Sequence, residues 1–281
     1  MRKQSRRVFL QQSAILAATS TLAMSAGLAG EPQKPAAKRL GKKGIGHGIK
    51  NEKDWNKLKA LNVSWLYNWN STVANGKPKE IEYVPMIWNG TSSKKVGPRI
   101  EALKAQGHKT LLGFNEPDQK EQANMTVAQA LELWPVLMES GMRLGSPGAA
   151  QPDKEWMKEF MAKAAEKKYR VDFVCVHWYW HPKPADFLGK LRAIHKLYNL
   201  PIWITEFAVA DWETSREKPN RFSEEEVAAF LQKVLPELEK THWIERYAWF
   251  PSGPNFPALS SSALFDKEGN LTKVGKAYAA G

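Results

Sequence analysis

A single cysteine, Cys175, stands in a chain of 281 residues, and this excludes an intramolecular disulfide. The stability of the fold must therefore come from packing. Cys175 lies in the mainly apolar run 171–176, which favours a buried small side chain. A nucleophilic thiol is the alternative, because His177 is close in sequence.

The common signatures of metal and nucleotide binding are also absent. There is no C-x-x-C, and the other histidines show neither H-E-x-x-H nor paired-ligand spacing: His47, His108, His181, His195 and His242. The glycine-rich segment 44–48 lacks the third glycine of a phosphate-binding loop. We therefore predict no catalytic metal and no cofactor.

No basic stripe accompanies the high net charge of +12. The lysines are mixed with glutamates along the expected helices, as at 158–159 and 166–168, which is typical of a solvated surface. We predict no nucleic-acid partner.

The N-terminal residues have the features of an export signal. Arg6-Arg7 is followed by Phe9-Leu10 and by an apolar stretch at 14–28, with small residues before a cleavage point after Ala29. We interpret residues 1–29 as a twin-arginine-type signal that sends the protein to the periplasm or the exterior. A membrane anchor is the alternative, but the stretch is short and weakly hydrophobic for a bilayer core, so we predict no stable membrane insertion once the signal is removed. Because twin-arginine export is often associated with cofactor proteins, a secreted metalloenzyme stays open.

Residues 30–43 resemble a flexible tether, with two prolines and several lysines and arginines. The remaining residues, 44–281, have the usual size of one (β/α)8 barrel, about 250 residues. We expect a monomer.

Apolar segments alternate with amphipathic segments throughout this domain. The pattern predicts strands at 44–46, 63–69, 83–88, 110–114, 143–147, 171–177, 202–205 and 244–249. It predicts helices at 54–61, 99–106, 126–141, 154–168, 186–198, 223–241 and 272–279, the third of them capped by Thr126.

Eight continuous apolar strands with helices between them favour parallel strands buried on both faces. The predicted fold class is therefore α/β, a single-domain (β/α)8 TIM barrel. An open doubly wound sheet is the alternative, but the missing phosphate loop disfavours it.

Two glutamates follow strands of the predicted barrel. Glu116 follows the fourth strand and Glu206 follows the seventh. Active-site residues of such barrels lie at the carboxyl ends of the strands. Glycosidic bond hydrolysis needs one carboxylic acid to protonate the departing oxygen and a second carboxylate to attack or to activate water, and this pair meets that need.

Four segments at strand ends carry a family resemblance: 112–118 (LGFNEPD), 176–179 (VHWY), 204–207 (ITEF) and 247–250 (YAWF). With them the chain resembles the clan A glycoside hydrolases, which carry Asn-Glu after strand four and a glutamate after strand seven. More narrowly, it resembles glycoside hydrolase family 128, the "glycosyl hydrolase catalytic core" proteins.

The resemblance implies a (β/α)8 barrel that cleaves β-1,3-glucan with retention of configuration, with Glu116 as acid/base and Glu206 as nucleophile. It also implies that Asn115 binds the sugar 2-hydroxyl and that Trp249 is a platform under the reacting sugar. Fold analogy does not fix the sugar.

Further residues are candidates for substrate binding. His177 and Tyr179 end strand six on one side, and a core pair is the alternative. The aromatic residues Trp69 and Trp88, with Asn68, lie at the ends of strands two and three, where ring faces could stack on sugars. A catalytically silent saccharide-binding protein would keep the same aromatic cleft, but it would not need the second glutamate.

Overall fold

A computed structural model describes residues 41–49, 52–215, 217–253 and 255–281. The expected export signal and all but the last residues of the expected tether lie outside the described residues. Within them, no helix is both long and apolar enough to cross a membrane.

Strands and helices alternate along the described chain, as the sequence predicts. The strands are β1 (Lys43–Gly46), β2 (Trp65–Tyr67), β3 (Glu82–Tyr83), β4 (Thr110–Leu111), β5 (Arg143–Leu144), β6 (Val174–Trp180), β7 (Ile202–Val209) and β8 (Ile244–Trp249). The helices are α1 (Glu52–Ala60), α2 (Ser93–Ala105), α3 (Val127–Met138), α4 (Glu155–Glu166), α5 (Pro184–Tyr198), α6 (Glu224–Lys240), the 3-10 helix η1 (Pro257–Ser262) and α7 (Lys273–Ala280).

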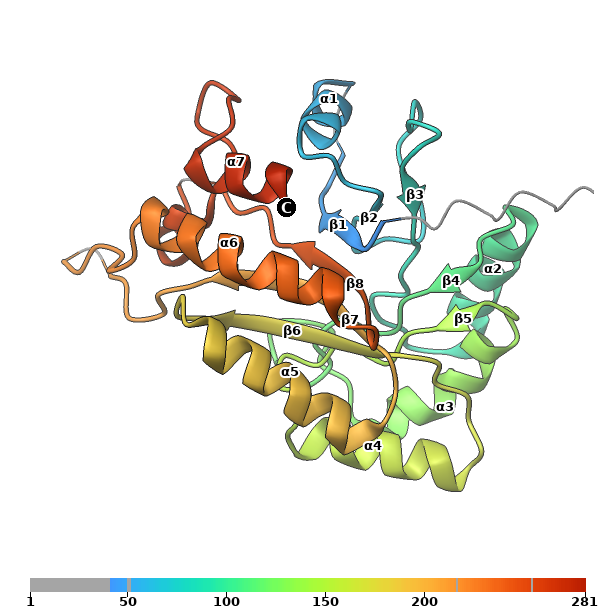
Figure 1. Cartoon of the computed structure of the whole chain (residues 1–281). Coiled ribbons are helices and arrows are strands. Elements are labelled where there is room, and N and C mark those ends of the chain that lie inside the picture. The colour runs from blue at the N-terminus through green and yellow to red at the C-terminus, as the bar shows by residue number, and fades with distance from the viewer. Residues whose placement is uncertain (1–40, 50–51, 216, 254) are drawn as a thin grey trace, which may run out of the picture. The chain divides into compact units, whose positions relative to one another are not determined.

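The strands form a closed parallel ring. One sheet has the order β3-β2-β1-β8-β7-β6, and β4 pairs with β5. Two parallel bridges, Met86 to Leu112 and Gly145 to Phe173, join these sheets at both sides. The helices lie outside the strands (Figure 1). The predicted (β/α)8 barrel is confirmed, and the open doubly wound sheet is wrong.

Local capping chemistry explains several helix boundaries. The Thr126 side chain accepts a hydrogen bond from the backbone of Gln129 and begins α3, as predicted, and Ser223 does the same for α6. Helix α2 begins six residues earlier than predicted. The predicted start at Arg99 follows Gly97-Pro98, a pair that resembles a helix break, but the helix carries Pro98 inside it. The 3-10 helix η1 was not predicted.

Aromatic rings fill the inside of the barrel. A separate cluster of buried residues, which we call the interior cluster, lies within the ring of strands: Trp65, Tyr67, Val84, Met86, Leu112, Phe173, Cys175, Trp203 and Ala248. Phe173 stacks on Trp203 with ring centroids 4.2 Å apart, and Trp65 lies 5.3 Å from Trp203. Cys175 is a buried member of this cluster, as its apolar surroundings in the sequence predict.

Glycines on neighbouring strands make room for these rings. A Cβ atom at Gly44 would lie 2.3 Å from the indole of Trp65, and one at Gly145 would lie 2.6 Å from Phe173. No real Cβ contact is that short, so a larger residue forces the rings or the strands to move.

Gly44→Ala is therefore expected to destabilise the protein by about 1–3 kcal/mol, through overpacking of the barrel interior. Gly189→Ala is the matched control, because Gly189 lies in α5 and an added Cβ would have only one atom, at 4.0 Å, nearby. The control should stabilise the protein by about 0.5–1 kcal/mol, since alanine is the better helix former. Urea unfolding followed by circular dichroism measures both, and an unchanged midpoint for Gly44→Ala would contradict the packing argument.

Candidate active site

A cleft of about 1190 Å³ lies at the carboxyl ends of the strands. Glu116 and Glu206 both line it. Its lining also includes aromatic and amide side chains from the loops after the strands. The predicted pair of glutamates therefore faces one shared space.

Glu116 is held where the chain leaves the fourth strand. Its backbone N–H donates to the carbonyl of Gly148 at 2.8 Å, beside a parallel bridge between Asn115 and Gly148. The backbone φ of Glu116 is +39°, in the left-handed region that non-glycine residues rarely adopt. Such strained positions occur at functional sites, where the surroundings maintain them.

Glu206 is buried on β7 and accepts three hydrogen bonds from neutral side chains. Oε1 accepts from the Tyr67 hydroxyl at 3.0 Å and from the Trp69 indole N–H at 2.8 Å. Oε2 accepts from the Tyr179 hydroxyl. These donors satisfy a buried carboxylate without a lysine or arginine partner.

The two tyrosine hydroxyls are held in their protonated form. Burial raises the pKa of Tyr67 well above its ordinary value, and the charge of Glu206 raises it further. The same causes, in the same order, raise the pKa of Tyr179. Both groups therefore act as hydrogen-bond donors to Glu206 across the ordinary pH range.

His177 lies between the two glutamates. Its Nδ1 is 2.9 Å from Oε1 of Glu116 and 3.5 Å from Oε2 of Glu206. We assign a proton to Nδ1, because it faces oxygens of two carboxyl groups. Burial lowers the pKa of His177, but the charge of Glu206 and the hydrogen bond to Glu116 outweigh burial, and the pKa is raised overall.

Gly148 makes room for this imidazole. A Cβ at Gly148 would lie 2.8 Å from Nε2 of His177, a buried atom that has no hydrogen-bond partner among the described residues. Gly148 therefore has two roles in the site. Its carbonyl accepts a hydrogen bond from the backbone N–H of Glu116, and its missing side chain leaves space for the imidazole of His177.

One atom each from Glu116, His177 and Glu206 lie within 4.8 Å of one another, a spacing that could also hold a metal ion. Two carboxylates and one imidazole suit a divalent transition metal. Oxygens of both glutamates already take part in hydrogen bonds, and the expectation that no metal takes part stays a prediction.

Most of the predicted binding residues line the cleft. Asn115 has a buried Oδ1 with no partner in the described part of the chain, while its Nδ2 donates to Gln122 at 3.3 Å. The others that line it are Trp69, Trp88, His177 and Tyr179. Trp69 also donates to Glu206, and its backbone φ is +59°.

Two predicted binding residues lie elsewhere. Trp249 is fully buried on the outer side of β8, where its indole N–H donates to the carbonyl of Ser262. The next residue, Phe250, lines the cleft in its place. Asn68 is turned into its own loop, where Nδ2 donates to Thr72 and Oδ1 accepts from Tyr83. Both predictions are wrong, because strand alternation turns each side chain away from the barrel mouth.

Other residues of the site were not predicted. Tyr67 lies two residues before Trp69, so period-two alternation puts both side chains on the same face of the chain. This spacing could have identified Tyr67 as a second partner of Glu206. Gly148, Phe250, Trp212 and Phe256 lie in connections after strands, where no periodicity marks them.

Comparison with known proteins gives a family. Residues 44–278 match the family model described as "Glycosyl hydrolase catalytic core". Among curated proteins, the chain is 32% identical over 227 residues to alkali-sensitive linkage protein 1 of Schizosaccharomyces pombe. The match includes 77% of this chain and only 40% of the length of that relative.

Solved structures give the same fold. A family 128 subgroup I endo-β-1,3-glucanase mutant from Amycolatopsis mediterranei, in complex with laminarihexaose, is 34% identical with a TM-score of 0.75, covering 85% of this chain and 98% of its own. A subgroup VII oligosaccharide-binding protein from Trichoderma gamsii is 20% identical with a TM-score of 0.68, covering 85% and 93%. At that identity the second likeness concerns the fold alone.

The raised pKa of His177 predicts a pH-dependent contribution to stability. Folding favours the protonated imidazole, so the contribution is complete below the ordinary pKa of about 6.5 and is lost as the pH rises through the folded-state value. The difference in unfolding free energy between the wild type and His177→Gln should therefore be larger at about pH 6 than at about pH 9. Urea unfolding at both pH values measures it.

Glu116→Gln supplies the control for this prediction. Without the carboxylate of Glu116, one cause of the raised pKa is gone, so the pH dependence of the His177→Gln effect should shrink in that background. An effect of His177→Gln that grows with pH in the wild-type background contradicts the assignment.

Proposed function

The chain belongs to the glycosyl hydrolase catalytic core family, and from this membership we propose that it is a retaining endo-β-1,3-glucanase. In the proposal, Glu116 is the catalytic acid/base and Glu206 is the nucleophile. The earlier resemblance to glycoside hydrolase family 128 is confirmed by the sequence and structural relatives.

The observation that carries the proposal is the closeness of the two carboxyl groups. One carboxylate oxygen of Glu116, one of Glu206 and one ring nitrogen of His177 all lie within 4.8 Å of one another. Retaining enzymes hold their carboxyl groups about 5–5.5 Å apart, whereas inverting enzymes leave about 6.5–9.5 Å for a water molecule. The short separation supports direct attack by one carboxylate.

The proposed reaction has two steps. First, the carboxylic acid of Glu116 gives its proton to the glycosidic oxygen while the carboxylate of Glu206 attacks the anomeric carbon, which forms a glycosyl ester and releases the shortened chain. Second, the carboxylate of Glu116 takes a proton from water as the water oxygen attacks the anomeric carbon, and Glu206 leaves as a carboxylate.

The hydrogen bonds around the pair suit these roles. Tyr67, Trp69 and Tyr179 stabilise an ionised Glu206, which is the form that attacks. Glu116 is less enclosed, with a side chain 13% exposed against 6% for Glu206, and can exchange its proton with water in the second step. Asn115 borders the cleft, and a small movement of its side chain would offer the buried, unpartnered Oδ1 to a sugar hydroxyl.

The choice of β-1,3-glucan is supported by the solved relatives. The Amycolatopsis mediterranei enzyme is an endo-β-1,3-glucanase and was solved with laminarihexaose. Trp69, Trp88 and Phe250 supply aromatic surface in the cleft here, and aromatic faces suit the apolar faces of sugar rings.

A substrate screen tests the function. Purified protein should release reducing ends from laminarin and yield a range of oligosaccharide sizes, as internal cleavage requires, with little release from β-1,4-glucan. The rival is a saccharide-binding protein without catalysis. Laminarin binding without any release of reducing ends, from fully folded protein at several pH values, would favour the rival and contradict the proposal.

Chemical rescue tests the two roles. Glu206→Ala should abolish hydrolysis, and azide should restore turnover of an aryl glycoside with a good leaving group, as an inverted glycosyl azide. Glu116→Ala should give a retained azide product, because azide then attacks the glycosyl-enzyme in the second step. Proton NMR of the products reads the configuration.

Glu116→Gln provides the accompanying control. It keeps the size of the side chain but removes the proton donor, so polymer hydrolysis should fall by about 10²- to 10⁴-fold while activated aryl glycosides lose less in the first step. A retained azide product from Glu206→Ala would exchange the two roles, and an inverted product from the wild type would overturn the covalent mechanism.

We also propose that residues 1–29 direct export by the twin-arginine route to the periplasm or the exterior. Replacing Arg6 and Arg7 by lysine should leave the precursor in the cytoplasm, because that route depends on the arginine pair. Immunoblots of cell fractions measure this, with a protein exported by the general secretory route as control. An unchanged distribution would contradict the proposal.

A further inference from the structure

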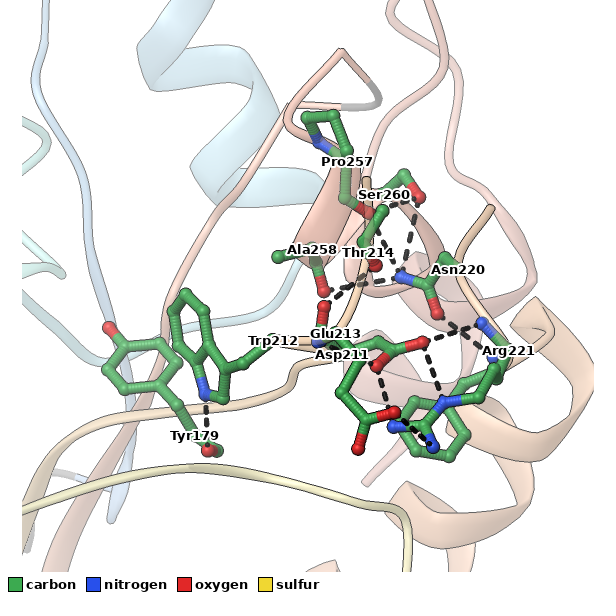
Figure 2. A network of polar contacts seen from close by, with 11 residues as sticks. Tyr179, Asp211, Trp212, Glu213, Thr214, Asn220, Arg221, Pro257, Ala258 and Ser260 are labelled. Carbon is green, nitrogen blue, oxygen red and sulfur yellow. Dashed lines mark hydrogen bonds and ion pairs between the residues drawn. The ribbon is translucent and has the colours of Figure 1, made fainter. Parts of the chain in front are cut away.

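The connection between β7 and α6 is organised around one buried carboxylate. Asp211 is 1% exposed, and its Oδ2 accepts from the backbone N–H of Arg221 at 2.9 Å and from Nε at 3.0 Å. Its Oδ1 accepts from Nη2 of Arg221 at 2.7 Å and from the backbone of Glu213 at 3.2 Å. Figure 2 shows these contacts gathered around the carboxylate. The hydrogen bond from Arg221 lowers the pKa of Asp211 to about 2, although burial alone would raise it.

Further hydrogen bonds attach both ends of this connection to η1. The backbone N–H of Asp211 donates to the carbonyl of Ala258 at 2.8 Å. The side chain of Asn220 donates to the carbonyls of Pro257 and Ala258 at 3.1 and 3.2 Å (Figure 2). Asp211 and Arg221 therefore close a loop whose two ends are both held against the same 3-10 helix.

Trp212 is the residue that this arrangement presents to the cleft. It directly follows Asp211, lines the cleft and is 55% exposed. Its indole N–H donates to the carbonyl of Tyr179 at 3.0 Å, and the two rings meet edge to face at 6.1 Å (Figure 2). Because more than half of Trp212 is exposed, we infer that the hydrogen bond to Tyr179 and the polar contacts of the neighbouring Asp211 set the direction of the ring.

Two more half-exposed aromatic residues line the same cleft. Trp180 is 55% exposed and Phe256 is 52% exposed, and Phe256 directly precedes η1. Exposed aromatic surface gathered in one place marks a binding surface. Among the described residues, the hydrogen bond and ring contacts of Trp212 and Trp180 are with Tyr179 and His181, not with the two glutamates, so we infer that this surface serves units of a bound chain away from the cleaved bond.

We propose that Asp211 and Arg221 are a positioning pair that holds Trp212 as a wall of the cleft, and that this wall binds sugar units beyond those at the two glutamates. The inference rests on the proposed function, since it takes a β-linked glucan as the ligand. A wall that is already ordered costs less conformational entropy when a chain binds. The pair therefore sets the affinity for longer chains and leaves the chemical step unchanged.

Substitution of Arg221 tests the pair. Arg221→Gln removes the paired charge, so KM for laminarihexaose should rise about 3- to 10-fold, while kcat changes less than about twofold, the size expected from losing one aromatic contact. KM for laminaritriose should change far less. When this three-unit chain is bound across the two glutamates, it has too few units left to extend to Trp212. Trp212→Ala should likewise raise KM for laminarihexaose much more than KM for laminaritriose. Because it removes the ring itself, its effect is the largest that Arg221→Gln can reach.

Two variants separate positioning from general stability. Arg221→Lys keeps the charge but loses the bidentate hydrogen bond to Asp211. Its affinity for laminarihexaose should therefore lie between those of Arg221→Gln and the wild type. The exposed carboxylate of Glu213 also lies near this guanidinium, with Oε2 3.3 Å from Nη1 of Arg221. Glu213→Gln removes that carboxylate and should leave both KM values unchanged. Urea unfolding of each variant checks that the protein is folded under the assay conditions.

Three outcomes overturn the inference. The pair has no positioning role if Trp212→Ala raises KM for laminarihexaose and Arg221→Gln does not. Trp212 is no wall for longer chains if Trp212→Ala affects neither substrate. A plain structural role replaces positioning if Arg221→Gln lowers kcat equally on both substrates.

Failure of the proposed function is a separate result. If the wild type hydrolyses neither substrate, dissociation constants from calorimetry replace KM for the same variants. A loss of affinity in Arg221→Gln that is confined to laminarihexaose then supports the wall without catalysis. Equal dissociation constants for Arg221→Gln and the wild type reject it.

Discussion

The fit of aromatic rings against glycines inside the barrel is the constraint on which the rest of the structure depends. Trp65, Phe173 and Trp203 fill a space that Gly44 and Gly145 leave open. The same strands carry the groups of the site only a few residues further on. Because a barrel interior is a packed core, the positions of its rings fix where the strand ends lie. The side chains of Tyr67, His177 and Glu206 can therefore meet in one cleft at the short distances that their polar contacts require.

Closely spaced carboxyl groups in a partly buried site repel each other when both are ionised, and the surroundings must offset this. The structure treats the two glutamates differently. Glu206 receives three neutral donors, whereas Glu116 shares the Nδ1 proton of His177 and keeps more contact with the cleft. The raised pKa of His177 follows from the same charges. An imidazole between the carboxyl groups thus compensates the charge of the pair, and Gly148 makes its placement possible by having no side chain.

The parts that could be predicted from the sequence are those with a local physical signature. Buried parallel strands are apolar runs, so the eight strands and the two glutamates that follow them could be located, and Thr126 marked its helix start through its capping box. Hydrophobicity alone does not tell which side chain at a strand end enters the cleft, because both faces of a barrel strand are apolar. Alternation from a neighbour of known direction does, and it places Tyr67 with Trp69. Trp249 instead packs against Tyr278 of α7 and Asn68 turns into its loop, against the prediction. The placement of Trp212 depends on its contact with Tyr179 and on the contact of Asp211 with η1, tertiary contacts that no local pattern encodes.

Strands and connections consequently differ in what they contribute to the cleft. The groups around the glutamates stand on strands whose positions are set by close packing, and a shift there disturbs several hydrogen bonds of one network at once. Trp212 stands on a connection held by a few polar contacts at its ends, with half of its surface exposed. Changes in that connection leave the barrel interior in place. The connection that carries Trp212 can therefore change while the geometry of the two glutamates stays the same.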